Sequence, residues 1–252
     1  MHFAYCTEEP LWTYPEDEAR KRGDGVNALT FSNRSFNPVD AARLYEERLE
    51  ELLLAEEVGF DGVMFNEHHN MPFTMHPRVN ISAAVAAALT TRLKIILLGN
   101  PLPLWSNPLQ LAEELGMIDL ISKGRLVPGI VRGGGAEQLA LNANPAYNRE
   151  LFEEVHDLLV KIWTAPGPFR WEGNHFQFRV VNPWTLPLQQ PHPRIYCPAR
   201  GRATRWSGPL GTGIRTLRWP RARRRHSTSG GCMAMPRAKL AMRQARRSPV
   251  TW

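Results

Sequence analysis

The stretch that decides the fold is Phe60-Asp61-Gly62-Val63-Met64-Phe65-Asn66-Glu67-His68-His69, an apolar run that ends on an acid and two histidines. A parallel α/β barrel places its chemistry in this way, because its buried strands carry functional side chains at their carboxyl ends. We therefore expect the chemistry of the chain to begin at Glu67-His68-His69, with the flanking residues as scaffold.

Four further segments have the composition of buried strands, and helical patterns separate them. We expect strands at residues 3–5, 93–98, 125–131 and 194–197, and helices at 37–58, 79–89, 107–123 and 148–163. Continuous apolar strands joined through helices are typical of a parallel sheet covered by helices. The sequence thus predicts an α/β fold that has about five of the eight strands of a closed barrel.

The first of these helices begins at Asn37-Pro38, a favourable cap and first position, and ends at Gly59. The helical spacing directs its apolar residues to the core, namely Ala41, Leu44, Tyr45, Leu49, Leu52 and Leu53. Residues 7–36 form a long polar connection that a barrel would carry at its mouth. Residues 165–194 contain no long periodic segment.

Composition is that of a soluble globular protein. The 252 residues are 43% hydrophobic, which is ample for a large core. Cys6, Cys197 and Cys232 form no C-x-x-C pair, so we expect neither a disulfide framework nor a zinc site. Residues 1–12 lack the regions of a secretory signal, and no apolar run reaches the roughly 18 residues that span a bilayer. We therefore expect a cytoplasmic protein.

The net charge of +7 combines two regions of opposite sign. Residues 201–252 contain twelve Arg, one Lys and no acid, which leaves 18 basic against 24 acidic groups in residues 1–200. The basic region also lacks a strand-like run and a convincing amphipathic helix. We expect a barrel portion at 1–200 and an Arg-rich tail at 201–252 that is disordered or derived from a frameshift.

Two hypotheses account for the tail. Its composition resembles a GC-rich gene translated out of frame, and a shifted frame from Thr204-Arg205-Trp206-Ser207 allows codons for a helix, a glycine and the start of a strand. We favour this hypothesis, which sequencing of the gene tests. The alternative is a basic arm, Arg221-Ala222-Arg223-Arg224-Arg225, that binds nucleic-acid phosphates. A salt-dependent DNA-binding assay with and without the tail separates the two.

Glu67-His68-His69 is the first candidate site. Histidine titrates near neutrality and is therefore suited to acid–base chemistry. The structural alternative is that one histidine caps the strand while the other is solvated. Adjacent residues of an extended segment point to opposite faces, so we do not expect the two histidines to share a metal ion.

Two further features follow neighbouring strands at the same edge of the sheet. Gly99-Asn100-Pro101 interrupts the strand at 93–98, either as a kink that brings backbone amides against a flat ligand or as an ordinary turn. Arg132-Gly133-Gly134-Gly135 offers a guanidinium and exposed N–H groups, which suit an anion. It matches neither a P-loop nor the dinucleotide fingerprint. Residues 122–126 lie at the opposite end of the sheet, where we expect a structural role.

With these motifs in place, residues 1–200 resemble the bacterial luciferase-like flavin monooxygenase family. The resemblance rests on Ala55 to Gly62 leading into Glu67-His68-His69, Asn107-Pro108 followed by Ala112-Glu113-Glu114, Asp119 to Leu126, Gly129-Ile130-Val131-Arg132-Gly133, and Gln190 to Ile195. It implies a TIM-type (β/α)8 barrel with an insertion region. It also implies reduced FMN and molecular oxygen as reactants, or the deazaflavin F420 in some relatives.

The resemblance also implies roles by position. His68 matches a histidine implicated in acid–base chemistry. Gly99-Asn100 falls at a kink that packs against the flavin ring, where many relatives have a cis peptide bond. Arg132 matches an arginine that contacts the flavin phosphate. We add the neighbours Glu67 and Gly133 to the expected cofactor-binding residues, and we expect no metal.

Three functional hypotheses remain open. The first is an FMN-dependent monooxygenase that oxygenates a small organic substrate, is supplied by a separate flavin reductase, and forms a homodimer in intact relatives. The second is an F420-dependent oxidoreductase that transfers hydride without oxygen. The third is a fragment without enzymatic activity. The resemblance ends after Cys197, where strands six to eight should close the barrel, so we expect exposed apolar surface and loss of activity in this form of the chain.

Overall fold

A computed structural model of the protein describes all residues except 1, 12, 16, 18–24, 200–214 and 219–252. Contacts divide the chain into Met1–Pro220 and Arg221–Trp252, and every described residue belongs to the first unit. Most of the expected tail therefore lies outside the described residues. The exception is Arg215–Arg218, a strand (β10) where the sequence predicted none.

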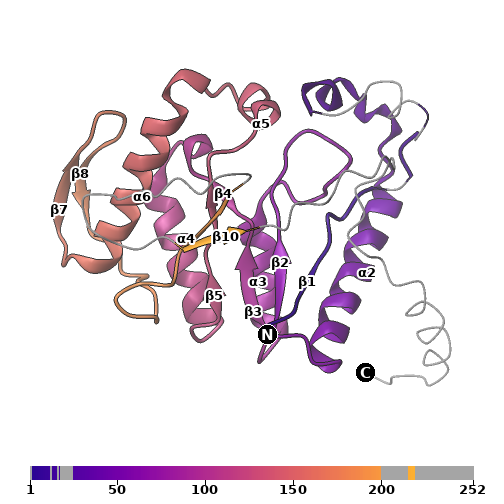
Figure 1. Cartoon of the computed structure of the whole chain (residues 1–252), viewed down its shortest axis with the longest axis horizontal. Helices are drawn as coiled ribbons and strands as arrows, with labels where there is room; N and C mark the ends of the chain where they lie inside the picture. Colours follow the sequence, from indigo (N-terminus) through magenta and orange to yellow (C-terminus); the bar gives the residue numbers. More distant parts are fainter. Residues whose placement is uncertain (1, 12, 16, 18–24, 200–214, 219–252) are drawn as a thin grey trace. The chain divides into compact units, whose positions relative to one another are not determined.

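Parallel strands that follow one another in chain order form the centre of the fold (Figure 1). One sheet has the order β1-β2-β3-β5, and two parallel pairs, β4 with β6 and β9 with β10, lie beyond it. Their bounds are β1 Ala4–Cys6, β2 Gly62–Phe65, β3 Lys94–Leu97, β4 Asn100–Pro101, β5 Leu126–Val127, β6 Ile130–Val131 and β9 Tyr196–Ala199. All five strand segments expected from the sequence are confirmed.

A backbone kink follows the strand expected at 93–98, as the sequence predicted, and a second kink divides the strand expected at 125–131. Gly99 separates β3 from β4, and Gly129 separates β5 from β6. The Asn100 N–H donates to the Gly129 carbonyl at 2.9 Å, and Gly129 also bridges to Tyr196 of β9. The parallel strands β1 to β6, β9 and β10 therefore follow the neighbour order of a parallel barrel, but the described strands do not close into one.

Helices follow the strands in alternation. They are α2 Pro38–Glu57, α3 Val79–Leu89, α4 Pro108–Ile121, α5 Gly135–Ala140 and α6 Asn148–Thr164, with short 3-10 helices η1 Gly25–Thr30, η2 Asn33–Ser35, η3 Leu102–Leu104 and η4 Pro145–Tyr147. The four long helices agree with the sequence prediction. Asn37 and Asn107 cap α2 and α4, each accepting two backbone N–H groups through its side-chain oxygen.

Two local expectations were wrong, and one element was not predicted. On α2, Tyr45, Leu49 and Leu53 are exposed, because the helix turns only its Ala41, Leu44, Leu52 and Ala55 stripe inward. Residues 165–194, which have no long periodic segment, contain a short antiparallel hairpin that was not predicted, β7 Phe169–Glu172 and β8 Gln177–Val181. The β10 strand forms without an apolar pattern, since parallel pairing to β9 uses backbone groups alone.

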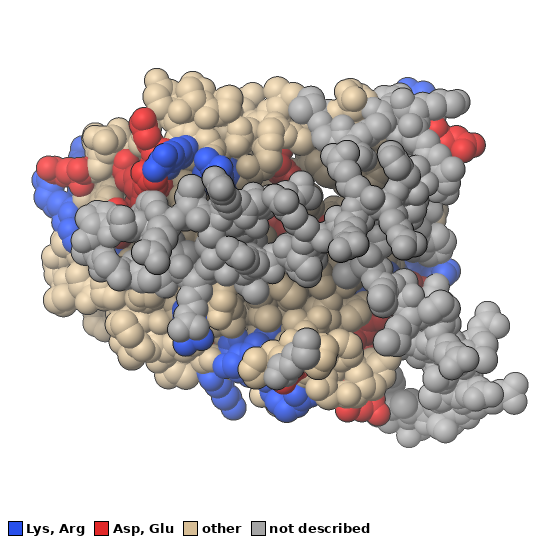
Figure 2. Space-filling view, in the orientation of Figure 1, with Lys and Arg blue, Asp and Glu red and all other residues tan. Residues whose placement is uncertain are grey.

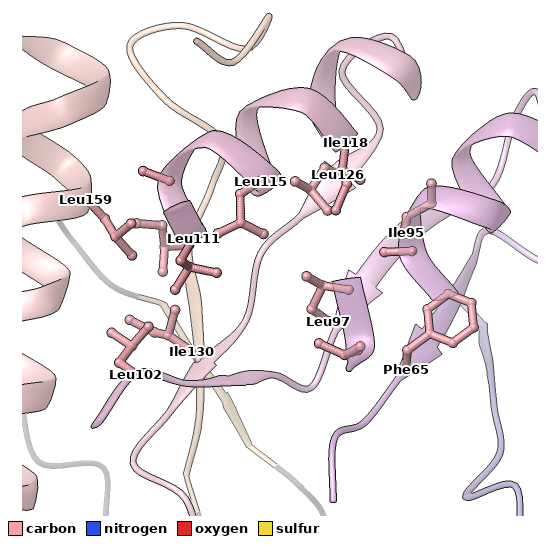
Figure 3. Packing of buried hydrophobic residues seen from close by; sticks show 14 of the residues in the cluster. Phe65, Ile95, Leu97, Leu102, Leu111, Leu115, Ile118, Leu126, Ile130 and Leu159 are labelled. Atoms are coloured by element: carbon pink, nitrogen blue, oxygen red, sulfur yellow. The ribbon is translucent and has the colours of Figure 1, made fainter. Parts of the chain in front are cut away.

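The core lies between the sheet and its helices. Figure 3 shows Leu111 of α4 beside Leu102 and Ile130, and Ile118 beside Leu126. The Asp119 carboxylate fixes Gln189 beside this layer, because it accepts hydrogen bonds from the backbone N–H and from the side-chain amide of Gln189. The helix-facing side of the sheet is therefore well packed.

The opposite face of the sheet is less well covered. Met64 of β2, Ile96 of β3 and Val127 of β5 are register partners in one row, and each is only partly buried. Their neighbours Ile95 and Leu97 point to the helices and are fully buried. A closed barrel fills this inner face with layers of side chains. In the described chain the inner face stays half exposed, as the sequence predicted for an open sheet.

Arg125 ties the amino-terminal end of the sheet to α3. Its guanidinium donates to the Thr90 hydroxyl and to the carbonyls of Ala87, Thr90, Leu93 and Ser122, at 2.7–2.9 Å. The structural role expected for residues 122–126 is confirmed. Among the described helices, none combines the length and apolarity needed to cross a membrane.

Candidate functional site

His68 lies beyond the carboxyl end of β2, where the loops after several strands meet. Its Nδ1 is 2.7 Å from Oε1 of Glu137, and its Nε2 is 3.9 Å from Oε2 of Glu8. Glu8 follows β1, and Glu137 belongs to α5, which follows β6. His68 therefore joins three parts of the chain at one edge of the sheet. The hydrogen bond to Glu137 raises the pKa of His68, which desolvation alone would lower.

Glu137 is fixed at both carboxylate oxygens. Oε1 contacts His68, and Oε2 accepts the backbone N–H of Gly134 at 2.7 Å. The His68 bond is the largest cause that holds the pKa of Glu137 below its ordinary value, against desolvation. The pair is therefore an imidazolium and a carboxylate over a pH range that includes the mildly acidic region.

Glu8 is the second acid near His68 and is itself held by neutral groups. Its Oε2 accepts from the Asn66 side-chain amide and from the Thr74 hydroxyl. The next residue, Glu9, is buried against His76 at 2.5 Å and accepts the Met75 N–H through its carbonyl. These contacts lock the loop after β1 to the loop after β2.

Glu67 and His69 form a buried pair next to the site. The Glu67 carboxylate lies 3.1 Å from His69 Nε2 and accepts the Val79 N–H, the first of α3, at 2.9 Å. Both side chains are almost fully buried. The structural alternative had one histidine capping the strand and the other solvated, but His69 is instead buried against Glu67. The carboxylate of Glu67 is occupied by groups of the protein itself.

The Gly99-Asn100 kink lies at the end of β3. Gly99 has a φ of +156°, and a Cβ there would lie 2.5 Å from the Gly129 carbonyl oxygen. The Asn100 side chain is turned to the helices, where its Nδ2 donates to Asn80 of α3 at 3.0 Å. On the side of the sheet that faces away from the helices, a ligand could therefore contact only the backbone atoms of the kink. The cis peptide bond implied by resemblance is not found, since both described cis bonds precede proline, at Gly167-Pro168 and Gln190-Pro191.

Arg132 and Gly133 follow β6 and border an open cavity. The cavity has a volume of about 290 Å³, near the lower limit for small-molecule pockets, and is lined by Arg132, Gly133, Gln138, Pro145, Ala146, Asn148 and Arg149. Within the described part of the chain, Arg132 has no ion-pair partner. Asn148 fixes the loop by donating to the Arg132 carbonyl at 2.7 Å.

Arg149 is the second cation of this cavity, but it is engaged. Its Nε donates to Glu153 one turn along α6 at 2.8 Å. Figure 2 shows acidic and basic side chains next to one another over the region where α6 lies in Figure 1. Arg132 is therefore the better candidate for an external anion. The Arg132 guanidinium, the Gln138 side-chain amide and the Gly133 backbone are donors that fit a phosphate group such as that of FMN.

The structure brings most predicted residues to one edge of the sheet. Asn100 of β4 pairs with Ile130 of β6, two residues before Arg132. Helix α5 carries Glu137, which contacts His68, and Gln138, which lines the cavity. Sequence reasoning missed Glu8 and Glu137. Glu8 was detectable as an acid directly after a strand. Glu137 was not, because a six-residue helix leaves no periodic signal.

Comparison with known proteins relates the whole fold to one family. The model of the family described as luciferase-like monooxygenase matches residues 29–227, so the match extends through β10. The oxygenase component of flavin-dependent trigonelline monooxygenase from Acinetobacter baylyi is 30% identical over 161 residues, 63% of this chain and 44% of that protein. FMNH(2)-dependent dimethylsulfone monooxygenase from Pseudomonas putida is 32% identical over 60% of this chain and 43% of that protein.

A solved structure agrees with these relatives. Monooxygenase RslO1 from Streptomyces bottropensis aligns with a TM-score of 0.62 and 29% identity, over 78% of this chain and 53% of that one. The chain spans about half the length of the proteins it matches. Because the family model matches most of the chain and the parallel strand order agrees, the chain belongs to the luciferase-like monooxygenase family.

Proposed function

We propose that the carboxyl edge of the sheet is the flavin site of a monooxygenase that uses reduced FMN and molecular oxygen to oxygenate a small organic substrate. The observation that carries the proposal is Arg132, a cation without an ion-pair partner among the described residues, beside Gly133 at an open cavity. An unpaired guanidinium at a glycine loop favours binding of a phosphate monoester. The names of two relatives, one flavin-dependent and one FMNH(2)-dependent, support the same cofactor class.

Each predicted residue has a proposed role that matches its contacts. Arg132 binds the flavin phosphate, with Gly133 and the backbone of Gly99-Asn100 beside the cofactor. Reduced flavin, when bound, supplies the electrons that activate oxygen. His68 is partly exposed, and its hydrogen bond to Glu137 raises its pKa above the ordinary value, so it serves as the acid–base group. Glu67 orients the segment by holding His69 and the start of α3.

The proposal includes two partners. A separate flavin reductase supplies the reduced cofactor, in keeping with the oxygenase-component name of one relative. The organic substrate occupies the half-exposed inner face of the sheet, where Met64, Ile96 and Val127 offer apolar contact. We further propose that complete relatives form homodimers.

Flavin titration of the purified chain tests the proposal. We expect saturable quenching of FMN fluorescence. We also expect the chain to change the rate at which chemically reduced FMN consumes oxygen, compared with the same FMN without protein. Absence of saturable binding to oxidised and reduced FMN would falsify the proposal. Binding of F420 in place of FMN, with hydride transfer under anaerobic conditions, would replace it by the deazaflavin alternative.

A further inference from the structure

We propose that Glu137 is a positioning residue that fixes the His68 imidazole with Nδ1 protonated and so keeps Nε2, which has no hydrogen-bond partner among the described residues, available to a ligand. The inference rests on the proposed function, because it assigns the working nitrogen of the acid–base group. It concerns residues of this chain alone, and its test needs neither flavin nor substrate.

The geometry separates the two ring nitrogens of His68. Nδ1 lies 2.7 Å from a carboxylate oxygen, which accepts and never donates when ionised, so the proton of neutral His68 resides on Nδ1. Nε2 has no hydrogen-bond partner within the described residues, since Glu8 lies 3.9 Å away. A neutral His68 therefore offers a lone pair at Nε2, and a protonated His68 offers a donor at the same atom.

Glu137 has the rigidity that a positioning group requires. Its side chain is 9% exposed, and its second oxygen accepts the Gly134 N–H at 2.7 Å. One oxygen thus fixes the acid to the loop after β6, and the other fixes the imidazole. Gln138 of the same helix lines the cavity beside Arg132, so α5 carries residues at both His68 and the anion end of the site.

Three acids face His68, and they differ in what they contribute. Glu137 of α5 makes the hydrogen bond, Glu8 after β1 is a more distant charge in a side chain that is 59% exposed, and Glu67 on the same segment is engaged with His69. Removal of Glu8 or Glu67 weakens the field at the imidazole. Only removal of Glu137 also releases Nδ1, so tautomer and proton affinity must change together in that variant alone.

Nitrogen-15 NMR of the histidine-labelled full chain tests the proposal, with His68 assigned through a His68→Gln variant. In the unchanged chain we expect neutral His68 to carry its proton on Nδ1. In Glu137→Gln we expect the proton affinity of His68 to fall by about 3- to 10-fold, with a larger share of the Nε2–H tautomer. Glu137→Asp keeps the charge and should restore part of the proton affinity.

Two controls separate positioning from a general loss of acid. Glu8→Gln should lower the proton affinity less and leave the tautomer unchanged, and Glu153→Gln on α6, whose carboxylate pairs with Arg149, should change neither. A neutral His68 protonated on Nε2 in the unchanged chain overturns the proposal even if every variant fails to fold. Unchanged tautomer and affinity in a folded Glu137→Gln chain overturn it as well.

The outcome is independent of the flavin proposal. A chain that shows the expected His68 behaviour and binds no flavin retains this inference and loses the proposed function. A chain that binds FMN while His68 titrates like a free imidazole loses this inference alone.

Discussion

Three histidines near one edge of the sheet are each paired with an acid, and burial decides what each pair can do. The side chains of His69 and His76 are 9% and 2% exposed, so their pairs with Glu67 and Glu9 hold loops together. His68 is 37% exposed and keeps Nε2 without a hydrogen-bond partner among the described residues. Of the three, His68 alone has the access that proton transfer to a ligand requires.

The His68–Glu137 pair predicts a pH-dependent contribution to stability. Partnering raises the folded-state pKa of His68 above 6.5 and lowers that of Glu137 below 4.5. The stabilisation that comes from the raised pKa of His68 is fully present below pH 6.5 and is lost as pH rises through that raised pKa. The stabilisation that comes from the lowered pKa of Glu137 is fully present above pH 4.5 and is lost as pH falls through that lowered pKa. Both parts are therefore complete between these two values.

We expect Glu137→Gln to lower the free energy of unfolding by about 0.5–1 kcal/mol at pH 5.5, the range for a pair that solvent screens in part. At pH 9 the loss should be smaller, because the charge of His68 is lost as pH rises through its raised pKa. Urea denaturation at the two pH values measures the difference. Equal losses at both values would show that the pair is not ionised in the folded protein.

Kinks at the ends of strands are the element-scale feature that shapes the site. The Gly99 and Gly129 backbones approach so closely that a Cβ at Gly129 would overlap the Leu97 carbonyl. The overlapping atoms are backbone atoms of β3, which cannot rotate away as a side chain can. Only glycine therefore allows β3 and β5 to continue into β4 and β6 at this spacing.

Gly129→Ala should consequently destabilise the protein by about 3 kcal/mol or more, at the upper end for overpacking. Gly135→Ala is the matched control, because nothing lies within 4 Å of a Cβ at that position. The control should unfold like the unchanged chain in urea. A Gly129→Ala chain as stable as the control would mean that the two strands separate at the kink.

Prediction from the sequence succeeded for elements whose ends are marked by local residue types. Asn37 and Asn107 indicate helix starts because their side chains cap the first backbone N–H groups, and the helix predicted at 79–89 matches α3 in both bounds. Prediction from the sequence failed where contacts between residues far apart in the chain determine the structure. The hairpin at β7–β8 is held by Glu154 of α6, which accepts the N–H groups of His175 and Phe176, and no local pattern encodes that anchor.

The candidate site divides in the same way. His68, Arg132 and the Gly99 kink were predictable because each follows an apolar strand, and parallel strands share one functional edge. The orientation of Asn100 toward α3 was not, because it depends on Asn80 from another helix. The partner of His68 was also beyond local reasoning, since 69 residues separate it from Glu137.

At the scale of the molecule, the described strands form an open sheet with one packed and one half-exposed face. Ile95 and Ile96 are adjacent residues of β3 whose side chains lie on the two different faces of this sheet. Ile95 is fully buried against the helices, whereas Ile96 lies in the partly buried inner row with Met64 and Val127. A closed barrel would bury both to the same extent.

Ile95→Ala should therefore cost about 3–4 kcal/mol, as for a fully buried aliphatic side chain, and Ile96→Ala less than about half of that. Denaturation of both variants under one set of conditions provides the comparison. Equal costs would indicate that the inner face is covered in the folded protein.

The central claim is that Arg132 binds the phosphate of a flavin at the carboxyl edge of the sheet. The most direct measurement compares the dissociation constants of FMN and riboflavin, which differ by that phosphate, for the unchanged chain, Arg132→Ala and the hairpin control Arg170→Ala. We predict that the unchanged chain and the control prefer FMN by about tenfold or more, and that Arg132→Ala loses this preference. An FMN preference that survives in Arg132→Ala would contradict the account.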